Sequence, residues 1–246
     1  MRVISAFVIA FSTYSRIPMP QVEWADENRK YSMCFFPLIG AVIGLLLWGW
    51  LWLCDALKIG ILLKGALGAI VPLLVTGVIH MDGFMDTSDA IASWQTRERR
   101  LEILKDSHTG AFAVIGCTGY LLLSAAVYGE MPVQAAPMLM GVFMISRSLS
   151  ALALAFFKSA RPGGMMDGFA RTAHRRMVSI VATVYAVFCA MLWAVCGKWI
   201  AVGCFAYYRH MAYKNFGGVT GDLAGWFVQI TELALAVVIV LGGKIL

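Results

Sequence analysis

Long apolar runs separated by short polar stretches extend over most of the chain. A membrane-spanning helix needs about 20 mostly apolar residues. The run at 198–212 is the shortest of these runs. The segment 2–15 is too short to cross a membrane, so we expect it to form an interfacial helix or a re-entrant segment. The pattern predicts an all-α fold, a polytopic integral membrane helical bundle with about six or seven transmembrane helices. The runs cover residues 33–54, 62–80, 111–128, 133–157, 178–196, 198–212 and 223–243.

Composition indicates a membrane protein rather than a soluble one. Of the 246 residues, 60% are hydrophobic and 14% are charged, whereas soluble domains carry roughly 25% charged residues. A soluble chain of this length could not bury that much apolar surface in one core. No low-complexity linker or soluble domain interrupts the pattern, so we treat residues 1–246 as a single membrane-embedded domain.

The cysteines and the first residues indicate neither zinc binding nor secretion. The first dozen residues have no clear basic region and no small-residue cleavage site, so a removed signal peptide is not expected. The six cysteines lie mostly inside apolar runs and lack zinc-finger spacing. We therefore expect reduced packing residues at Cys34, Cys54, Cys117, Cys189, Cys196 and Cys204.

The chain has a net charge of +6, and the positions of its basic residues indicate how it is oriented in the membrane. The basic residues form no nucleic-acid-binding motif, so we expect the lipid bilayer, and no nucleic acid, as a partner. With residues 1–32 in the cytoplasm, the positive-inside rule places most Lys and Arg residues on the cytoplasmic side. Every stretch rich in Asp, Gly or Arg then falls on that face. The opposite side keeps Lys58, Lys64, Lys198 and Lys244.

Three aspartates lie in the stretch 80–89, where the second apolar run ends. On a helix, Asp82, Asp86 and Asp89 share an arc of about 60°. Because like charges at this spacing repel, a divalent cation such as Mg²⁺, completed by substrate phosphate oxygens, fits the cluster. Gly83 leaves room for a phosphate or headgroup to approach the backbone. The alternative is a solvated acidic helix start with Asp82 as its cap.

Two further polar stretches contain candidate phosphate ligands. Residues 97–110 predict a short amphipathic helix that runs into the third span, and Lys105 is the candidate ligand within it. Alternatively, the stretch forms only surface ion pairs, and Asp106 or Ser107 caps the next helix. Arg161, followed by Pro-Gly-Gly, either clamps an anionic group or belongs to a chain reversal.

A glycine-rich stretch, 217–222, precedes the last span. Its three glycines allow backbone N–H groups to form an anion nest, and Asp222 is a candidate metal ligand. A flexible loop with a helix cap is the alternative interpretation.

Ionisable residues inside apolar runs are candidates for function. Arg147 and Glu232 either face a polar interior as functional groups or pair with each other or with the aspartates. His80 and His174 have no second histidine at ligand spacing, so we expect hydrogen-bonding roles rather than metal ligation.

Taken together, these stretches resemble the cobalamin synthase family (adenosylcobinamide-GDP ribazoletransferase). The departures from the family pattern are Met85, Ala90, His108 and Gln229, and none of them touches the three aspartates or the terminal Gly-Gly loop. The matching pieces occur in the family's order over nearly the whole chain, at 15–20, 36–40, 80–89, 101–107, 160–164 and 217–222.

The resemblance implies a transferase of the prokaryotic inner or plasma membrane with its active site facing the cytoplasm. A ribose hydroxyl of α-ribazole, or of its 5′-phosphate, attacks the cobinamide-bound phosphorus of adenosylcobinamide-GDP, and GMP leaves. Catalysis and Mg²⁺ binding are then expected at Asp82, Asp86 and Asp89, with Asp89 preferred over Asp82 as the base. The expected substrate-binding residues are Gly83, Lys105, Asp106, Arg147, Arg161, Gly217, Gly218, Thr220 and Asp222.

Two other functions fit the sequence less well. A phospholipid-type CDP-alcohol phosphotransferase would carry an Ala-Arg pair after Asp-Gly-x-x, which this chain lacks. A cation or proton-coupled transporter would place its site near the midplane and show internal repeats, neither of which the sequence indicates. The sequence leaves open whether the chain forms a homo-oligomer or contacts other enzymes of the cobalamin pathway.

Overall fold

A computed structural model describes residues 2–192 and 195–245, and no strand forms within them. The single extended pairing in this part of the chain is a bridge between Ser159 and Val219. The predicted all-α fold is therefore confirmed. In chain order the helices are α1 (Arg2–Tyr14), α2 (Asp26–Arg29), the 3-10 helix η1 (Ser32–Cys34), α3 (Phe36–Ala56), α4 (Ile61–Thr76), α5 (Ile79–Ala92), α6 (Arg97–Ile103), α7 (Ala111–Glu130), α8 (Met138–Phe156), α9 (Met165–Thr172), α10 (Arg175–Leu192), α11 (Val195–Phe216) and α12 (Gly221–Ile245).

Four helices of the described residues are long and apolar enough to span a membrane, namely α3, α7, α8 and α12. Helices α4 and α5 meet the same condition only as a pair, and α5 is bent by 100° from α4. The described chain thus supports a polytopic membrane protein with four or five spans, fewer than the predicted six or seven. The spans predicted at 178–196 and 198–212 correspond to α10 and α11, which flank residues 193–194 outside the described part.

The sharp bend between α4 and α5 corrects the prediction that the aspartates end the second span. Two consecutive residues, Gly77 and Val78, adopt left-handed conformations with φ of 60° and 61°, which ends α4. The backbone N–H of Arg16 donates to the Val75 carbonyl (2.7 Å), so the loop after α1 supports the bend. Helix α5 therefore runs nearly perpendicular to α4 and does not continue it as a straight span.

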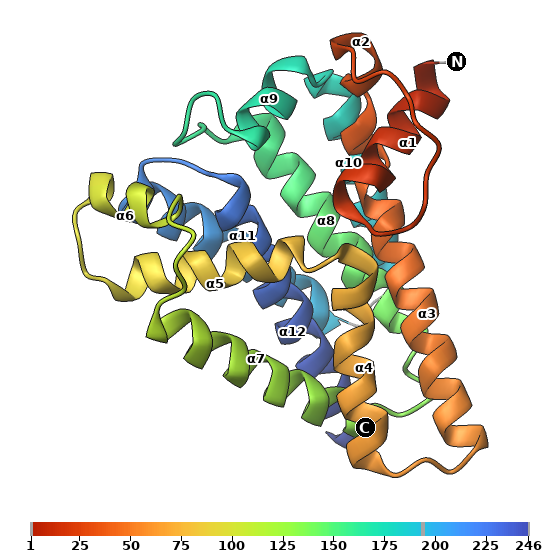
Figure 1. Ribbon diagram of the computed structural model, residues 1–246. Coiled ribbons are helices and arrows are strands. Elements are labelled where there is room, and N and C mark those ends of the chain that lie inside the picture. The colour runs from red at the N-terminus through yellow and green to blue at the C-terminus, as the bar shows by residue number, and fades with distance from the viewer. Residues whose placement is uncertain (1, 193–194, 246) are drawn as a thin grey trace.

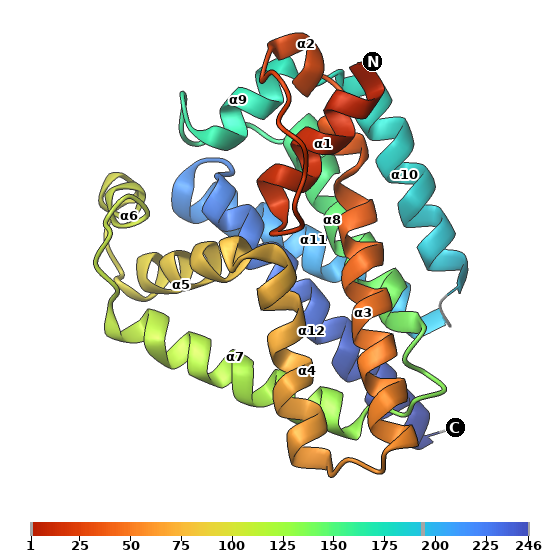
Figure 2. The same cartoon turned by 45° about the vertical axis from the view of Figure 1, so that its right-hand side comes forward.

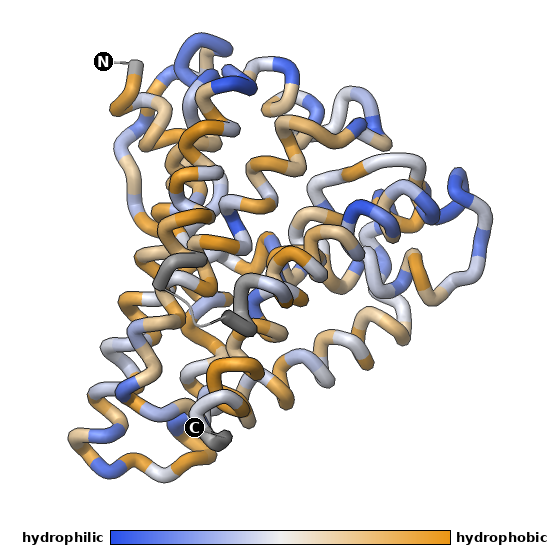
Figure 3. Tube along the Cα trace, turned by 180° about the vertical axis from the view of Figure 1, so that it is seen from behind, coloured by the Kyte–Doolittle hydropathy of each residue, from blue (hydrophilic) through white to orange (hydrophobic). Residues whose placement is uncertain are grey.

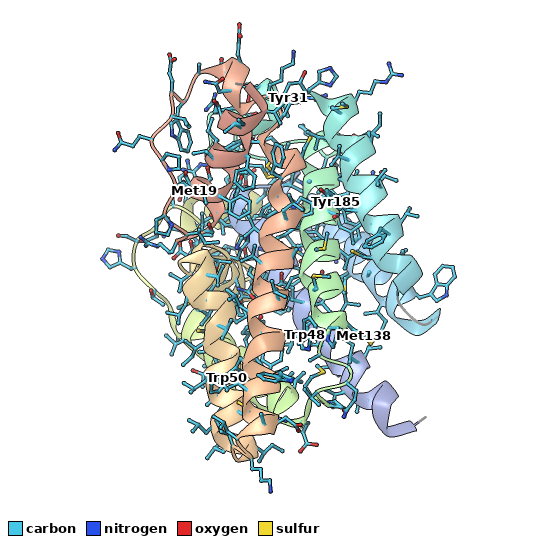
Figure 4. All side chains as sticks on the ribbon, turned by 90° about the vertical axis from the view of Figure 1, so that its right-hand side faces the viewer. Met19, Tyr31, Trp48, Trp50, Met138 and Tyr185 are labelled. Atoms are coloured by element: carbon cyan, nitrogen blue, oxygen red, sulfur yellow. The ribbon has the colours of Figure 1, made fainter. Side chains whose placement is uncertain are left out.

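Helix α8 forms the centre of the bundle, where it packs against α3, α10 and α12. Helix α5 crosses the bundle and packs against α12 and α7 (Figures 1 and 2). Hydrophilic residues gather along α6 and around α2, whereas the spanning helices are mainly hydrophobic (Figure 3). Tyr31 and Trp50 lie toward opposite ends of the molecule (Figure 4).

The described cysteines agree with the predicted packing role. Those whose side chains the structure describes are free thiols, and Cys196 lies outside that set. The free thiols are those of Cys34, Cys54, Cys117, Cys189 and Cys204.

Helices α3 and α8 approach closely because two glycines of α3 face α8. A Cβ atom on Gly40 would overlap the carbonyl oxygen of Phe143, and one on Gly44 would overlap the backbone of Met140. Lipid supplies no hydrophobic force between helices, so membrane bundles depend on such small residues for close backbone packing. The contact fixes the position of α8, on which the rest of the core is built.

We predict that Gly40→Ala destabilises the protein by about 1–3 kcal/mol, because the added methyl group forces the α3 and α8 backbones apart. Gly49→Ala is the matched control, since a Cβ atom there meets nothing within 4 Å. Thermal unfolding in detergent, followed by circular dichroism, measures both variants. Equal melting temperatures for the two would contradict the close α3–α8 contact.

Candidate active site

A cavity of about 480 Å³ lies where α1, α5, α9 and α12 approach one another. Its lining includes two groups of side chains that interact among themselves. The first is charged and polar, with Asp82, Arg161 and Asp222 as its main members. The second is aromatic and consists of Tyr14, Phe36 and His80, with ring centroids 4.6–6.3 Å apart. The cavity therefore suits a ligand with both anionic and flat apolar parts.

Two loops far apart in sequence meet at this cavity. The backbone N–H of Val219 donates to the Lys158 carbonyl (2.8 Å), and that of Ala160 donates to the Val219 carbonyl (2.9 Å). This pairing brings Arg161, from the loop after α8, to the same cavity as Asp222 at the start of α12. Gly218 lies directly against the Lys158 backbone, where any side chain would clash.

The anion nest expected at Gly217 and Gly218 does not form, because carbonyl oxygens of the chain accept their N–H groups. Gly217 donates to the Tyr213 carbonyl (3.1 Å), and Gly218 donates to that of Ala212 (3.4 Å). Both glycines instead serve to end α11 and to pair the two loops. Thr220 does line the cavity, and its Oγ1 accepts the Leu223 N–H (3.3 Å) as the cap of α12.

The dipole of α12 favours negative charge at its first turn, although Thr220 Oγ1 already accepts the Leu223 N–H and Asp222 stands in the same turn. Gly221 and Asp222 lie in the first turn and line the cavity. Backbone N–H groups in a first turn have no partner within the helix, and the helix dipole favours negative charge there. The nearby Arg161 guanidinium acts electrostatically on Asp222 and adds positive charge to the same place.

Gly83 has a structural role that the sequence analysis did not predict. A Cβ atom on Gly83 would lie 2.7 Å from the Asp222 carbonyl oxygen, and one on Gly225 would lie 2.9 Å from the His80 carbonyl oxygen. The two glycines thus allow α5 and α12 to cross in backbone contact. The space beside Gly83 is filled by α12 rather than open to a phosphate.

The carboxylates of Asp82, Asp86 and Asp222 lie close together where α5 meets α12. Asp82 is exposed in the cavity wall and Asp86 is half-buried on the next turn. Burial, followed by repulsion from the neighbouring carboxylates, raises the pKa of Asp86 to about 7. These neighbours, in order of effect, are Asp82, Asp222 and Asp89. The cluster is electrostatically unfavourable without a cation, which is the physical basis of the predicted metal site.

Asp89 faces a different partner from the one predicted. Its carboxylate accepts the backbone N–H groups of Gly110 (2.6 Å) and Ala113 (2.9 Å), so it caps the start of α7. A Cβ atom on Gly110 would lie 2.6 Å from the carboxylate oxygens, which explains the glycine. Within the described residues, no three acidic, His or Cys side chains lie close enough to hold a metal ion among themselves.

Lys105 and Asp106 lie outside the cavity lining and are exposed. Asp106 Oδ1 accepts the backbone N–H of His108 (3.0 Å) and pairs with His108 Nδ1 (2.6 Å). These hydrogen bonds lower the pKa of Asp106. Helix α6 ends at Ile103, so the helix predicted over 97–110 is shorter than expected and does not run into α7.

Arg147 pairs with Glu232, which was one of the open alternatives. Both side chains are buried, at 1% and 2% exposure, and Ser146 Oγ donates to Glu232 Oε1 (2.8 Å). Arg147 also donates to the Phe143 carbonyl (3.0 Å). Arg147 does not line the cavity, so its predicted substrate contact is absent from this structure.

Sequence reasoning missed Tyr14, Phe36 and Asp167, which line the cavity. Asp167 Oδ2 accepts the Gly163 N–H (2.8 Å) and pairs with Arg171 (2.9 Å), which holds the loop after Arg161. Tyr14 and Phe36 adjoin or belong to the pieces at 15–20 and 36–40 that carry the family resemblance. Their place beside or within these pieces was the only feature of the sequence that could have identified them.

This chain is similar to known proteins over nearly its whole length. The family described as cobalamin-5-phosphate synthase matches residues 6–240. The adenosylcobinamide-GDP ribazoletransferase of Lachnoclostridium phytofermentans is 43% identical over 98% of this chain and 96% of that protein. Those of Clostridium botulinum and Pseudomonas putida are 31% and 33% identical, over 92% and 96% of this chain and 93% and 98% of those proteins. No solved structure matches the chain significantly.

We predict that Glu232→Gln destabilises the protein by about 3–5 kcal/mol, because it leaves the buried Arg147 charge without a carboxylate. The control is Glu102→Gln, which breaks the exposed pair with Arg99 and costs about 1 kcal/mol or less; that pair is 61–62% exposed. Chemical or thermal unfolding in detergent gives both values. A Glu232 variant as stable as the Glu102 variant would refute the buried pair.

Asp89→Ala is expected to lower the free energy of unfolding by about 0.5–2 kcal/mol, the usual cost of losing a helix cap. Asp89→Asn keeps an acceptor oxygen and should lose less. Hydrogen exchange of the Gly110 and Ala113 amides provides the direct measurement, since both should exchange faster in the alanine variant. Unchanged exchange at these two amides would show that Asp89 does not cap α7.

Proposed function

Because the chain belongs to the cobalamin-5-phosphate synthase family, we propose that it catalyses the reaction for which its relatives are named. It transfers the adenosylcobinamide-phosphate group of adenosylcobinamide-GDP to α-ribazole or α-ribazole 5′-phosphate. The products are GMP and adenosylcobalamin or adenosylcobalamin 5′-phosphate. The observation that carries the assignment of the site is the meeting of Asp82, Arg161 and Asp222, from three distant segments, in one cavity.

The chemistry is a substitution at phosphorus. A ribose hydroxyl oxygen forms a bond to the cobinamide-bound phosphorus while the bond from that phosphorus to the GMP oxygen breaks. The hydroxyl proton passes to a carboxylate, and the released GMP carries the electron pair of the broken bond. Such a reaction requires positioning and neutralisation of phosphate charge more than covalent participation of the protein.

Arg161 and the start of α12 are the groups that bind phosphate oxygens in this proposal. A guanidinium donates in a bidentate geometry that matches phosphate, and the dipole of α12 favours negative charge at its first turn. Asp89 is occupied by the α7 backbone. The proton acceptor is therefore assigned to the carboxylates around Asp82 and Asp86 in place of Asp89.

Mg²⁺ is proposed as the cofactor, held by Asp82 and Asp222 with Asp86 beside them. Mg²⁺ commonly takes one or two carboxylates from a protein and completes its shell with water and substrate phosphates, so a preformed cage of three ligands is not required. The mutual repulsion of these carboxylates supports a cation at this place. The ion would neutralise charge on the transferring and leaving phosphates.

We further propose that the cavity opens to the cytoplasm of a prokaryotic inner or plasma membrane. Support comes from Arg161 and from the basic residues of α6, which follow the excess of positive charge expected on that side. The transporter alternative loses its proposed ion path, because Arg147 and Glu232 neutralise each other inside the bundle.

The purified protein in lipid or detergent should release GMP from adenosylcobinamide-GDP only when α-ribazole and Mg²⁺ are both present. Asp82→Asn and Asp222→Asn should each lower this rate by roughly 100-fold or more, with little loss of stability. Asp55→Asn is the matched control, since Asp55 is exposed near the end of α3 and does not line the cavity.

Full activity of Asp82→Asn or of Asp222→Asn would contradict the proposed site. Replacing the donor with CDP-diacylglycerol tests the phospholipid-type alternative, and the proposal expects no CMP release. Chelation of Mg²⁺ should abolish GMP release, and its return should restore the rate.

A further inference from the structure

His80 is a buried polar side chain of the cavity wall for which the reaction described above has no use. It lines the cavity on the first turn of α5 and is 6% exposed. Within the described residues, its Nδ1 has no hydrogen-bond partner. Buried nitrogen atoms of this kind are nearly always satisfied in folded proteins. Because the Nδ1 atom itself is enclosed by protein, a ligand in the cavity contacts the ring at its cavity-facing edge or reaches Nδ1 after a small rotation of the ring.

The His80 ring is held in a fixed orientation by aromatic neighbours. It stacks on Phe36, with ring centroids 5.8 Å apart and planes 18° apart, and on Tyr14 at 6.3 Å and 30°. Behind it, Phe36 also lies under the Arg147 guanidinium, 5.7 Å from the ring centroid. Glu232 pairs with Arg147 and fixes it in place. The buried ion pair therefore supports the aromatic wall without touching the cavity.

Resting on the proposed function, we propose that His80 binds the nucleoside acceptor by hydrogen-bonding a ribose hydroxyl, while the partly exposed Tyr14 provides aromatic surface for its base. An imidazole ring and a hydroxyl group each both donate and accept hydrogen bonds, so the two are complementary. Aromatic side chains bind flat bases by stacking with little dependence on the base's hydrogen-bonding pattern.

The acceptor suits this wall better than the donor does. Donor phosphates require cationic groups, and among the described lining residues Arg161 belongs to the other, charged group. The attacking hydroxyl must lie about 3–3.5 Å from phosphorus, so the acceptor has to be held beside the phosphate-binding residues. His80 and Asp82 line the same cavity from one helix, which meets that condition.

Steady-state kinetics with each substrate varied in turn tests the inference. His80→Ala should raise the KM for α-ribazole by about tenfold, which corresponds to one hydrogen bond. The KM for adenosylcobinamide-GDP should stay within about twofold of wild type. His80→Asn and His80→Gln keep a hydrogen-bonding amide and should recover part of the loss. Equilibrium binding of α-ribazole without donor should show the same order of variants.

His174→Ala is the matched control. His174 also stacks on an aromatic ring, that of Tyr31 at 5.7 Å, but it does not line the cavity. It should leave both KM values unchanged. An unchanged KM for α-ribazole in the His80 variants, or a rise only in the KM for the donor, would overturn the assignment.

The experiment separates this inference from the proposed function. If the wild-type protein releases no GMP, the proposed function itself is rejected. If the wild type is active and folded His80 variants bind the acceptor as well as the wild type does, only the role of His80 is rejected. If His80→Ala does not fold, the Asn and Gln variants carry the test, and loss of stability without any change of KM would show a structural role alone.

Discussion

The contact between α5 and α12 is the constraint on which the cavity depends. Helix α5 can cross the start of α12 in backbone contact only because Gly83 and Gly225 carry no side chains. This crossing places Asp82 and Asp222 on one cavity wall, although 140 residues separate them (222 − 82). The pairing of the loops at Ser159 and Val219 then adds Arg161. The charges of the site are thus positioned by close packing of glycine-rich backbone.

A membrane environment makes each buried charge depend on a partner. Arg147 and Glu232 satisfy each other in the centre of the bundle, and Asp89 is satisfied by the backbone at the start of α7. Within the described residues, Asp82 and Asp86 have no ion-pair partner, and Asp82 lies in the cavity wall. The charges that the fold leaves uncompensated are therefore the ones available to a cation and to substrate phosphates.

The apolar runs predicted the spans formed by α3, α7, α8 and α12, because length and hydrophobicity decide which segments can span. They also predicted spans at 178–196 and 198–212, where the described residues form no helix that meets that condition. The bend at Gly77 and Val78 was not predictable in this way, since the run at 62–80 continues through it without a polar interruption. Helical periodicity correctly grouped Asp82 with Asp86. It also grouped Asp89 with them, because periodicity within one helix cannot reveal that a neighbouring helix begins beside Asp89.

The role of the glycines shows the same limit. Gly83, Gly217 and Gly218 looked like phosphate-binding positions, and in each case the space beside the glycine is taken by another part of the chain or its N–H by a carbonyl. A glycine in a sequence indicates that another group approaches the backbone closely, but it does not identify that group. Tyr14 and Phe36 became recognisable as cavity residues only when the helices were assembled.

The central claim is that Asp82 and Asp222 act together at one site. A double-mutant cycle on kcat/KM for GMP release, with the two Asn variants singly and combined, measures this directly. The account predicts strong non-additivity, with the double variant about as slow as the slower single variant. Losses that multiply, as they do for independent sites, would contradict it.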